Sequence, residues 1–174
     1  MRTPTVLFLL LMTASTASAE SAGGLNWTAP AGWKSEGTQP LRVATYPVPP
    51  TAGDRDPAEC AVYFFGAGQG GSVQANVDRW KGQFHGPDGK TSAARVATRM
   101  IHGLTVTTID TSGEYSGLGG PVAPGPAKPF YRLLGAIVEG PGGNVFLKFT
   151  GPMKTIAANQ AKFEQLLTSF QKAP

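Results

Sequence analysis

The chain has 174 residues, a length that suits a single domain. Its 41% hydrophobic content excludes a fully disordered chain, and a single Cys without any Gly period or heptad run excludes a disulfide scaffold, a collagen and a coiled coil. The 23 Gly and 15 Pro residues predict a loop-rich fold, and the formal net charge of +4 is mild.

Residues 1–19 have the pattern of a secretory signal peptide. Arg2 supplies the positive charge, residues 6–12 form the apolar core, and residues 17–19 (Ala-Ser-Ala) are a small-residue cleavage site. The apolar core is shorter than the roughly 20 residues that span a bilayer, and no later segment is long or apolar enough to do so. A buried N-terminal helix is the alternative, but the order of charged, apolar and small residues favours export. We therefore expect a periplasmic or extracellular protein that is cleaved after Ala19.

Residues 20–40 are expected to form an extended lead-in whose Trp residues cover a core. Residues 41–48 alternate well enough for a strand, and the apolar run at 59–65 is typical of a central strand that is buried on both faces. Cys60 lies in that run without a neighbouring His or Lys to activate it, so we expect it to pack as a small buried side chain. A reactive or intermolecular thiol is the alternative for this residue.

A Gly-rich loop at residues 66–71 leads into the first expected helix. Ser72 is a good N-cap because its hydroxyl can accept a hydrogen bond from an amide of the first turn. Apolar residues then recur at helical spacing, which predicts a helix that ends at His85, before Gly86-Pro87. The apolar stripe of this helix consists of Val73, Val77, Trp80 and Phe84.

The region 94–115 is expected to be a β-hairpin. His102-Gly103 is a natural two-residue turn because Gly takes a positive φ at no steric cost. Along the first strand, alternation places Val96 and Met100 on the inner face and the two arginines of this strand in solvent.

The remainder of the chain contains a Gly/Pro loop, a second hairpin and a closing helix. The loop spans residues 116–129 and has no periodicity, and the hairpin consists of apolar strands at 130–139 and 145–149. Gly151-Pro152 opens the closing helix, with Pro near the first helical position. The apolar stripe of this helix consists of Ile156, Phe163, Leu166, Leu167 and Phe170.

These elements predict the fold class. Strands joined by tight turns are antiparallel, and two amphipathic helices must bury their stripes against the sheet. The sequence therefore predicts one α+β domain at 41–174, with a twisted antiparallel sheet of about six strands packed by two helices.

The element order, with the late hairpin from Tyr131 to Phe149 and the closing pattern Phe163-x-x-Leu166-Leu167-x-Ser169-Phe170, resembles the Mog1/PsbP-like fold. Three motifs are more narrowly similar to a set of secreted bacterial proteins: Arg42-x-Ala44-Thr45-Tyr46, Gly70-Gly71 with Asn76-Val77-Asp78-Arg79-Trp80-Lys81-x-Gln83-Phe84, and Lys148-x-x-Gly151-Pro152. The resemblance covers most of residues 25–171, and its helix motif is the most specific part. It implies a non-catalytic accessory or binding protein, since members of the fold act in photosystem assembly, small-GTPase regulation and cell-envelope roles. It carries over no catalytic residue.

The Gly-rich loop and the helix after it form the candidate binding site. Glycines let backbone amides approach a ligand, and a helix N-terminus favours an anion. A tight structural turn is the alternative, because the glycines lack the spacing of a nucleotide-binding loop. The polar residues that flank Trp80 would contact a ligand or, alternatively, hydrogen-bond the neighbouring loop backbone. The candidate residues are Gln69, Gly70, Gly71, Ser72, Asn76, Arg79, Trp80 and Gln83.

The sequence favours an exported, non-catalytic binding or accessory module of the cell envelope that binds a small anionic ligand or a protein partner. The chain has no Cys/His metal spacing and no nucleophile elbow, and we expect no metal, cofactor or catalytic residue. Basic residues between Arg79 and Arg99 form either a solvated face or a patch for an anionic partner, and we expect no nucleic acid for an exported chain.

Two alternative functions stay open on the sequence alone. The first is an extracytoplasmic hydrolase of anionic substrates, with His85 or Asp78 as the base and the loop amides as an anion hole. That function requires Asn76, Arg79 and His85 to point into one cleft. The second is a structural envelope protein that associates through the segment 27–33, which contains two Trp residues.

Overall fold

The computed structural model describes residues 19–117 and 126–174 of the chain. Of the expected signal peptide, residues 1–18 lie outside the described residues, and so do residues 118–125 of the expected Gly/Pro loop. The signal peptide therefore stays a prediction. Among the helices in the described ranges, none has both the length and the apolarity needed to cross a membrane.

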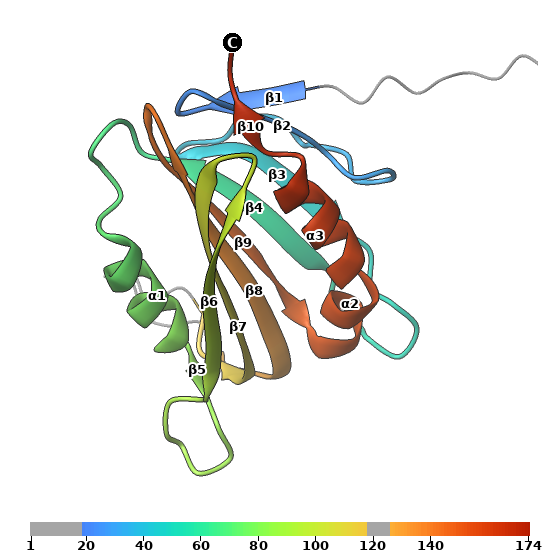
Figure 1. Ribbon diagram of the computed structural model, residues 1–174. Coiled ribbons are helices and arrows are strands. Elements are labelled where there is room, and N and C mark those ends of the chain that lie inside the picture. Colours follow the sequence, from blue (N-terminus) through green and yellow to red (C-terminus); the bar gives the residue numbers. More distant parts are fainter. Residues whose placement is uncertain (1–18, 118–125) are drawn as a thin grey trace, which may run out of the picture.

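A seven-stranded antiparallel sheet forms the body of the molecule (Figure 1). Its order is β3-β4-β9-β8-β7, and β5 and β6 both pair with the far side of β7, at different parts of that long strand. His102 and Gly103 close the β6–β7 hairpin with φ angles of 47° and 75°, so the turn predicted there is confirmed. The strands are β3 (Arg42–Val48), β4 (Ala58–Phe64), β5 (Phe84–His85), β6 (Ala94–Ile101), β7 (Leu104–Tyr115), β8 (Lys128–Gly140) and β9 (Gly143–Pro152).

Helices cover the two faces of this sheet (Figure 1). The helix α1 (Val73–Lys81) lies on one face, and α2 (Met153–Ala158) and α3 (Gln160–Thr168) lie on the other. Because successive strand residues point to opposite faces, β9 serves both: Phe146 belongs to the core under α1 and Leu147 to the core under α3. The predicted α+β class is confirmed, with seven strands in the main sheet and three helices in the described ranges.

A second, three-stranded sheet brings the two ends of the described chain together. In it, β2 (Leu25–Thr28) lies between β1 (Ala19–Ala22) and β10 (Gln171–Lys172), and both pairings are antiparallel. Trp27 on β2 stacks on Phe170 with 5.0 Å between the ring centroids, and both side chains are buried. The expected lead-in therefore contributes two strands and core side chains to the structure.

The first helix is shorter than the sequence predicted. It ends at Lys81, and Phe84 and His85 form β5 instead of a last helical turn. In the sheet Phe84 is fully buried, with its ring centroid 5.0 Å from that of Tyr115. Packing against the sheet thus overrides the helical spacing of the sequence.

The expectations for the inner face of β6 and for a single closing helix are both wrong. Val96 and Met100 are 48% and 64% exposed rather than buried, since β6 is an edge strand that pairs only with β7 among the described strands. The closing helix is divided at Asn159, whose φ of −110° departs from helical geometry, although its whole apolar stripe is buried.

Cys60 is fully buried as expected, and burial raises the pKa of its thiol well above the usual range.

Candidate functional site

A cavity of about 330 Å³ opens between α1 and the strands β3, β4 and β9. Four of its ten lining residues are aromatic, and its charged groups are all basic, so we call it the basic cavity. The lining residues are Pro40, Leu41, Arg42, Tyr63, Phe65, Arg79, Trp80, Gln83, Phe146 and Lys148.

Strand register places several of these side chains on one face of the sheet. Arg42 on β3 lies opposite Tyr63 on β4, and Tyr63 lies opposite Phe146 on β9. Lys148 follows Phe146 by two residues, so it points to the same face. The pairing of three strands, rather than any local motif, therefore brings an arginine, a tyrosine and a lysine together.

Lys148 is the buried charge of the basic cavity. The residue is only 6% exposed, and its ammonium group donates to Gln83 Oε1 at 2.6 Å and to the Tyr115 hydroxyl at 3.2 Å. Among the described residues, no carboxylate forms an ion pair with it. Burial is the main cause that lowers the pKa of Lys148 to about 8, because desolvation disfavours the charged form.

Two arginines lie near the buried lysine. Arg42 pairs with Glu59 at 2.9 Å, and its guanidinium carbon lies 5.5 Å from the centroid of the Tyr63 ring. Arg79 donates to Asn76 Oδ1 and forms no ion pair with the part of the chain that the structure describes. Both positive charges add to the lowering of the lysine pKa, and the Glu59 carboxylate opposes it. The site thus holds three cations against one nearby carboxylate.

The predicted site residues divide between the cavity lining and the loop beside it. Asn76 is buried, and its amide donates to the Gly70 carbonyl at 2.8 Å and to the Ser72 carbonyl at 2.9 Å. These bonds satisfy the loop backbone, which is the alternative that the sequence left open for Asn76. Because its oxygen also accepts from the neighbouring arginine, Asn76 connects the loop to the cavity. The predicted residues that line the cavity are Arg79, Trp80 and Gln83.

Gly70 lets the loop close against the aromatic wall of the basic cavity. Its φ is 89°, and an added Cβ would lie 2.7 Å from the Phe65 ring and 2.8 Å from the Phe146 ring. No other residue type would fit that position without a shift of the rings. This contact supports the alternative in which Gly70 belongs to a tight structural turn.

The remaining predicted residues lie on the surface of the loop. Ser72 caps α1 as predicted, because its hydroxyl accepts from the amide of Ala75 at 3.2 Å. Gln69 and Gly71 are exposed and lie outside the lining of the cavity. Contact of any of these residues with a ligand stays a prediction.

Sequence reasoning missed three polar residues of this site: Arg42, Tyr63 and Lys148. Two signals were available in the sequence. A lysine in the middle of an apolar strand is rare, because lysine is almost never fully buried without a partner. Arg42 and Lys148 also stand in two of the three motifs that carry the family resemblance. Neither signal shows that the two residues meet.

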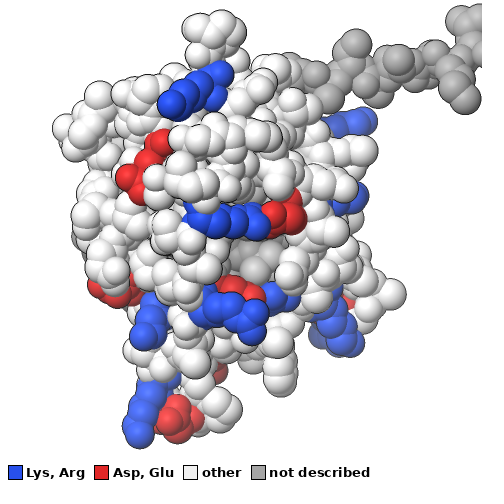
Figure 2. All heavy atoms as spheres, in the orientation of Figure 1, with Lys and Arg blue, Asp and Glu red and all other residues white. Residues whose placement is uncertain are grey.

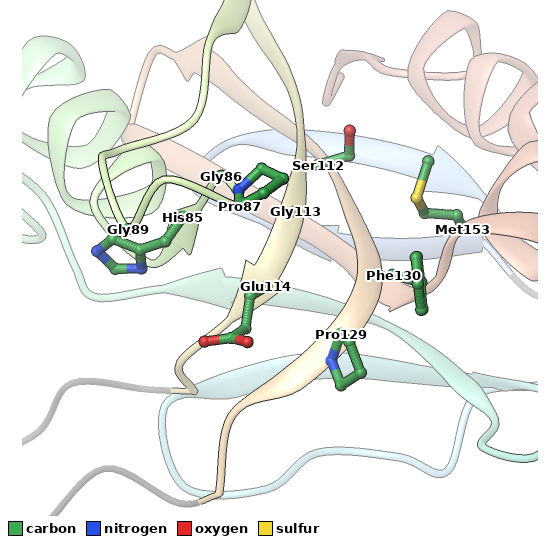
Figure 3. A pocket seen from close by; sticks show the side chains of 10 residues that line it. All are labelled: His85, Gly86, Pro87, Gly89, Ser112, Gly113, Glu114, Pro129, Phe130 and Met153. Atoms are coloured by element: carbon green, nitrogen blue, oxygen red, sulfur yellow. The ribbon is translucent and has the colours of Figure 1, made fainter.

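A second cavity, of about 530 Å³, contains His85 and Glu114, which come from the neighbouring strands β5 and β7 (Figure 3). Arg79 lines the basic cavity instead, and Asn76 is turned to the loop backbone, so these residues do not share a cleft with His85. The geometry expected for a hydrolase with His85 as its base is therefore wrong. Asp78, the other candidate base, is exposed on α1. Within the described ranges, no group of three His, Cys, Asp or Glu side chains is placed to hold a metal ion.

The segment 27–33 does not offer its tryptophans for association. Trp27 is 1% exposed and Trp33 is 5% exposed, and both belong to the core under α3. Trp33 packs against Tyr46 and Phe149, with ring centroids 5.8 and 5.0 Å apart. The surface expected for a purely structural envelope protein is therefore not formed by these two side chains.

On the face shown in Figure 2, Lys and Arg side chains lie beside Asp and Glu side chains rather than in one continuous basic patch. Arg99 pairs with Glu164, and Lys90 Nζ lies 3.9 Å from Asp88 Oδ2. These pairs fit a solvated face for Lys90 and Arg99. Arg79 differs from them because it lines the basic cavity.

Comparison with solved structures finds matches over almost the whole chain. LpqN of Mycobacterium tuberculosis, a protein involved in cell envelope biogenesis, matches with a TM-score of 0.55 at 10% identity, over 92% of this chain and 87% of LpqN. PA94 of Pseudomonas aeruginosa, a protein of unknown function, matches with a TM-score of 0.51 at 12% identity, over 91% of this chain and 98% of PA94. Cyanobacterial PsbP of Synechocystis sp. PCC 6803 matches with a TM-score of 0.49 at 13% identity, over 94% of this chain and 98% of that protein.

No protein-family model and no curated protein sequence matches the chain. The α+β fold that the Mog1/PsbP-like resemblance implied is confirmed by the structural matches with LpqN and PA94. At identities of 10% and 12%, these matches establish the fold alone. The function must be argued from the basic cavity.

Proposed function

We propose that the protein is an exported, non-catalytic accessory module of the cell envelope that binds a small anionic ligand in the basic cavity. The observation that carries this proposal is the buried ammonium group of Lys148, which has no carboxylate partner among the described residues. Removing a charge from water is costly unless an opposite charge and hydrogen bonds replace the lost hydration. Gln83 and Tyr115 supply hydrogen bonds, and an anionic ligand would supply the missing charge.

The walls of the cavity favour a ligand with a flat apolar part beside its negative charge. The rings of Tyr63 and Phe65 stack with 6.0 Å between centroids, and Trp80 closes the cavity from the side of α1. Aromatic faces pack well against flat apolar groups. Arg42 and Arg79 present planar guanidinium groups, which bind carboxylates and phosphates through two parallel hydrogen bonds. The volume of about 330 Å³ suits a small molecule.

The signal-peptide pattern and the fold support the export and envelope parts of the proposal. Residues 1–19 have the order of charged, apolar and small residues typical of secreted proteins, and LpqN shares the fold. Cleavage after Ala19 would leave Glu20 as the first residue. The intact mass of the protein recovered from the extracytoplasmic fraction of its host tests this, and a chain that still begins at Met1 would contradict it.

Phenyl phosphate is a suitable first probe for the ligand class, with binding measured by isothermal titration calorimetry. We expect saturable binding, because the probe combines an anion with a flat ring. Benzyl alcohol, which has the ring without the charge, should bind much more weakly. Arg79→Gln should weaken phenyl phosphate binding by about tenfold or more, since a hydrogen bond to a charged group contributes about 1.5–3 kcal/mol.

Arg95→Gln is the matched control for this experiment. It also removes one exposed arginine, but this arginine lines a groove on the opposite face of the sheet, beside α3. Its phenyl phosphate affinity should equal that of the unmodified protein. Because Arg79 and Arg95 are both exposed, both variants should fold, and a thermal melt checks this. Equal affinities of the Arg79 variant and the unmodified protein would refute the site, and no binding of any aromatic anion would refute the function.

A further inference from the structure

The Lys148 amine has the surroundings of a reactive amine as well as those of a buried charge. It is nearly inaccessible to bulk water, yet it lines both the basic cavity and an adjoining hollow of about 50 Å³. Hydrogen bonds to Gln83 and Tyr115 hold its Nζ in place. A lysine that is desolvated or placed beside other cations is activated as a nucleophile, because its neutral form is then populated near neutral pH.

Charged and titratable groups on several elements surround this amine. They are Arg42 on β3, Glu59 and Tyr63 on β4, Arg79 on α1 and Tyr115 on β7. Burial and the two arginines lower the pKa of Lys148 to about 8, although the Glu59 carboxylate acts to raise it. At pH 7 the neutral fraction is therefore roughly 300-fold larger than for a lysine with the usual pKa of 10.5. Burial raises the pKa of Tyr115 to about 12, so its hydroxyl keeps its proton.

We propose that the Lys148 amine captures the carbonyl group of an anionic aldehyde or ketone as an imine, with the negative charge of the ligand bound by Arg42 and Arg79. This inference rests on the proposed function, because the same cavity and the same arginines bind the ligand. It narrows the ligand class from small anions to anionic carbonyl compounds. The role of the lysine changes accordingly, from a counter-charge to the group that forms a covalent bond.

The reaction balances without a further reactant. The lone pair of the neutral Nζ forms a bond to the carbonyl carbon while the π electrons of the C=O bond move to the oxygen, and one of the two nitrogen protons then passes to that oxygen. The resulting carbinolamine loses its hydroxyl group and the nitrogen proton as water, and a C=N double bond forms. No group is oxidised or reduced, and hydrolysis reverses the reaction. The Tyr115 hydroxyl, 3.2 Å from Nζ, lies within reach of these proton transfers.

Reductive trapping with pyridoxal 5′-phosphate, a phosphorylated aromatic aldehyde, tests the inference. The full chain is incubated at neutral pH with less than one equivalent of the probe, and sodium cyanoborohydride reduces any imine to a stable secondary amine. Peptide mass spectrometry then locates the modified lysines. We expect Lys148 to be modified roughly tenfold faster, or more, than the exposed Lys90 and Lys154 of the same molecule. Modification of Lys148 at the rate of the exposed lysines, or more slowly, would overturn the inference.

The uncharged aldehyde pyridoxal separates the anchoring of the anion from the reactivity of the amine. In the unmodified protein, Lys148 should react faster with the phosphorylated aldehyde than with pyridoxal. Arg79→Gln should remove most of this difference, and Arg95→Gln should preserve it. The same ratio of rates in all three proteins would overturn the assignment of the anion to the arginines.

Pyridoxine 5′-phosphate, which has an alcohol in place of the aldehyde, distinguishes failure of this inference from failure of the proposed function. If pyridoxine 5′-phosphate binds saturably but pyridoxal 5′-phosphate is not trapped at Lys148, the anion site stands and the inference of imine formation is overturned. Absence of both binding and trapping would overturn both. Lys148→Arg keeps the positive charge but cannot form the imine, so its peptide should gain no mass. The comparison of lysines within the unmodified protein holds even if this variant does not fold.

Discussion

The two faces of the seven-stranded sheet carry different kinds of core. Under α2 and α3 the packing is apolar, as in the stacked pair Phe149 and Phe163, whose ring centroids are 5.8 Å apart. Under α1 the apolar cluster is interrupted by the buried polar side chains of Asn76, Gln83 and Lys148. Polar burial of this kind adds little to stability, because desolvation offsets what the new contacts contribute. The comparison teaches that the larger apolar core lies on one face of the sheet and the candidate site lies on the other.

The largest expected effect tests the apolar face. Phe149→Ala removes a fully buried ring that also packs against Trp33, so it should lower the free energy of unfolding by about 3–5 kcal/mol. Urea denaturation measures this loss. The matched control is Phe130→Ala, which truncates a ring that is 78% exposed and should change stability much less. Equal losses in the two variants would break the distinction between a stabilising face and the rest of the surface.

A smaller effect, of opposite sign, is expected on the α1 face. Lys148→Met replaces the ammonium group by an apolar end on a chain of similar length. At neutral pH the variant should be more stable by about 1–3 kcal/mol, because the cost of burying the charge disappears. It should also lose phenyl phosphate binding. A variant that is less stable than the unmodified protein at neutral pH would show that the lysine is part of the structural core.

The same pair of proteins should differ in the pH dependence of stability. The unfolded lysine, with a pKa of 10.5, binds more protons than the folded one, with a pKa of about 8. The contribution of Lys148 to the free energy of unfolding therefore rises with pH between about 8 and 10.5 and is constant below that window. The difference in free energy of unfolding between the Met variant and the unmodified protein should therefore fall by about 3 kcal/mol from pH 8 to pH 10.5. Lys154→Met, which removes a lysine at an exposed position, is the matched control, and parallel profiles for both lysine variants would refute the buried charge.

The smallest expected effect concerns the loop beside the site. Asn76→Ala removes the hydrogen bonds to the carbonyls of Gly70 and Ser72 and should cost about 1–2 kcal/mol. It should also weaken phenyl phosphate binding, because Arg79 loses the oxygen that positions it. Gln74→Ala, on the exposed side of the same helix, is the control and should leave both quantities nearly unchanged. Unchanged ligand affinity in the Asn76 variant would separate the loop from the site.

Much of the fold follows from local signals in the sequence. Alternating apolar residues or continuous apolar runs predict most strands of the main sheet. Ser72 marks the start of α1, because a hydroxyl there satisfies an otherwise free amide. The short strand β5 could not be predicted in this way. The helical spacing of Phe84 with Trp80 suggests one more helical turn, and only the pairing with Tyr115 shows that this phenylalanine belongs to the sheet. Long-range pairing leaves no local pattern.

The candidate site was less predictable than the fold for the same reason. Arg79 and Trp80 stand on α1 and Gln83 follows it by two residues, so nearness in the sequence alone groups them. Arg42 and Lys148 belong to β3 and β9, which do not pair with each other but both pair with β4. Their meeting depends on the register of two strand pairs, which a single sequence does not specify. The Gly-rich loop lies beside the basic cavity, where Gly70 allows the close approach of the Phe65 and Phe146 rings, and its contact with a ligand stays a prediction.

The small sheet has a consequence for how the chain reaches its final state. The amide of Thr28 donates to the hydroxyl of Ser169 at 3.0 Å, across a separation of 141 residues. Contacts between such distant parts of a chain require the closure of a long loop and form slowly. Trp27 can stack on Phe170 only after Phe170 has been synthesised and has docked. The stacking of Trp27 on Phe170 therefore belongs to a late stage of folding.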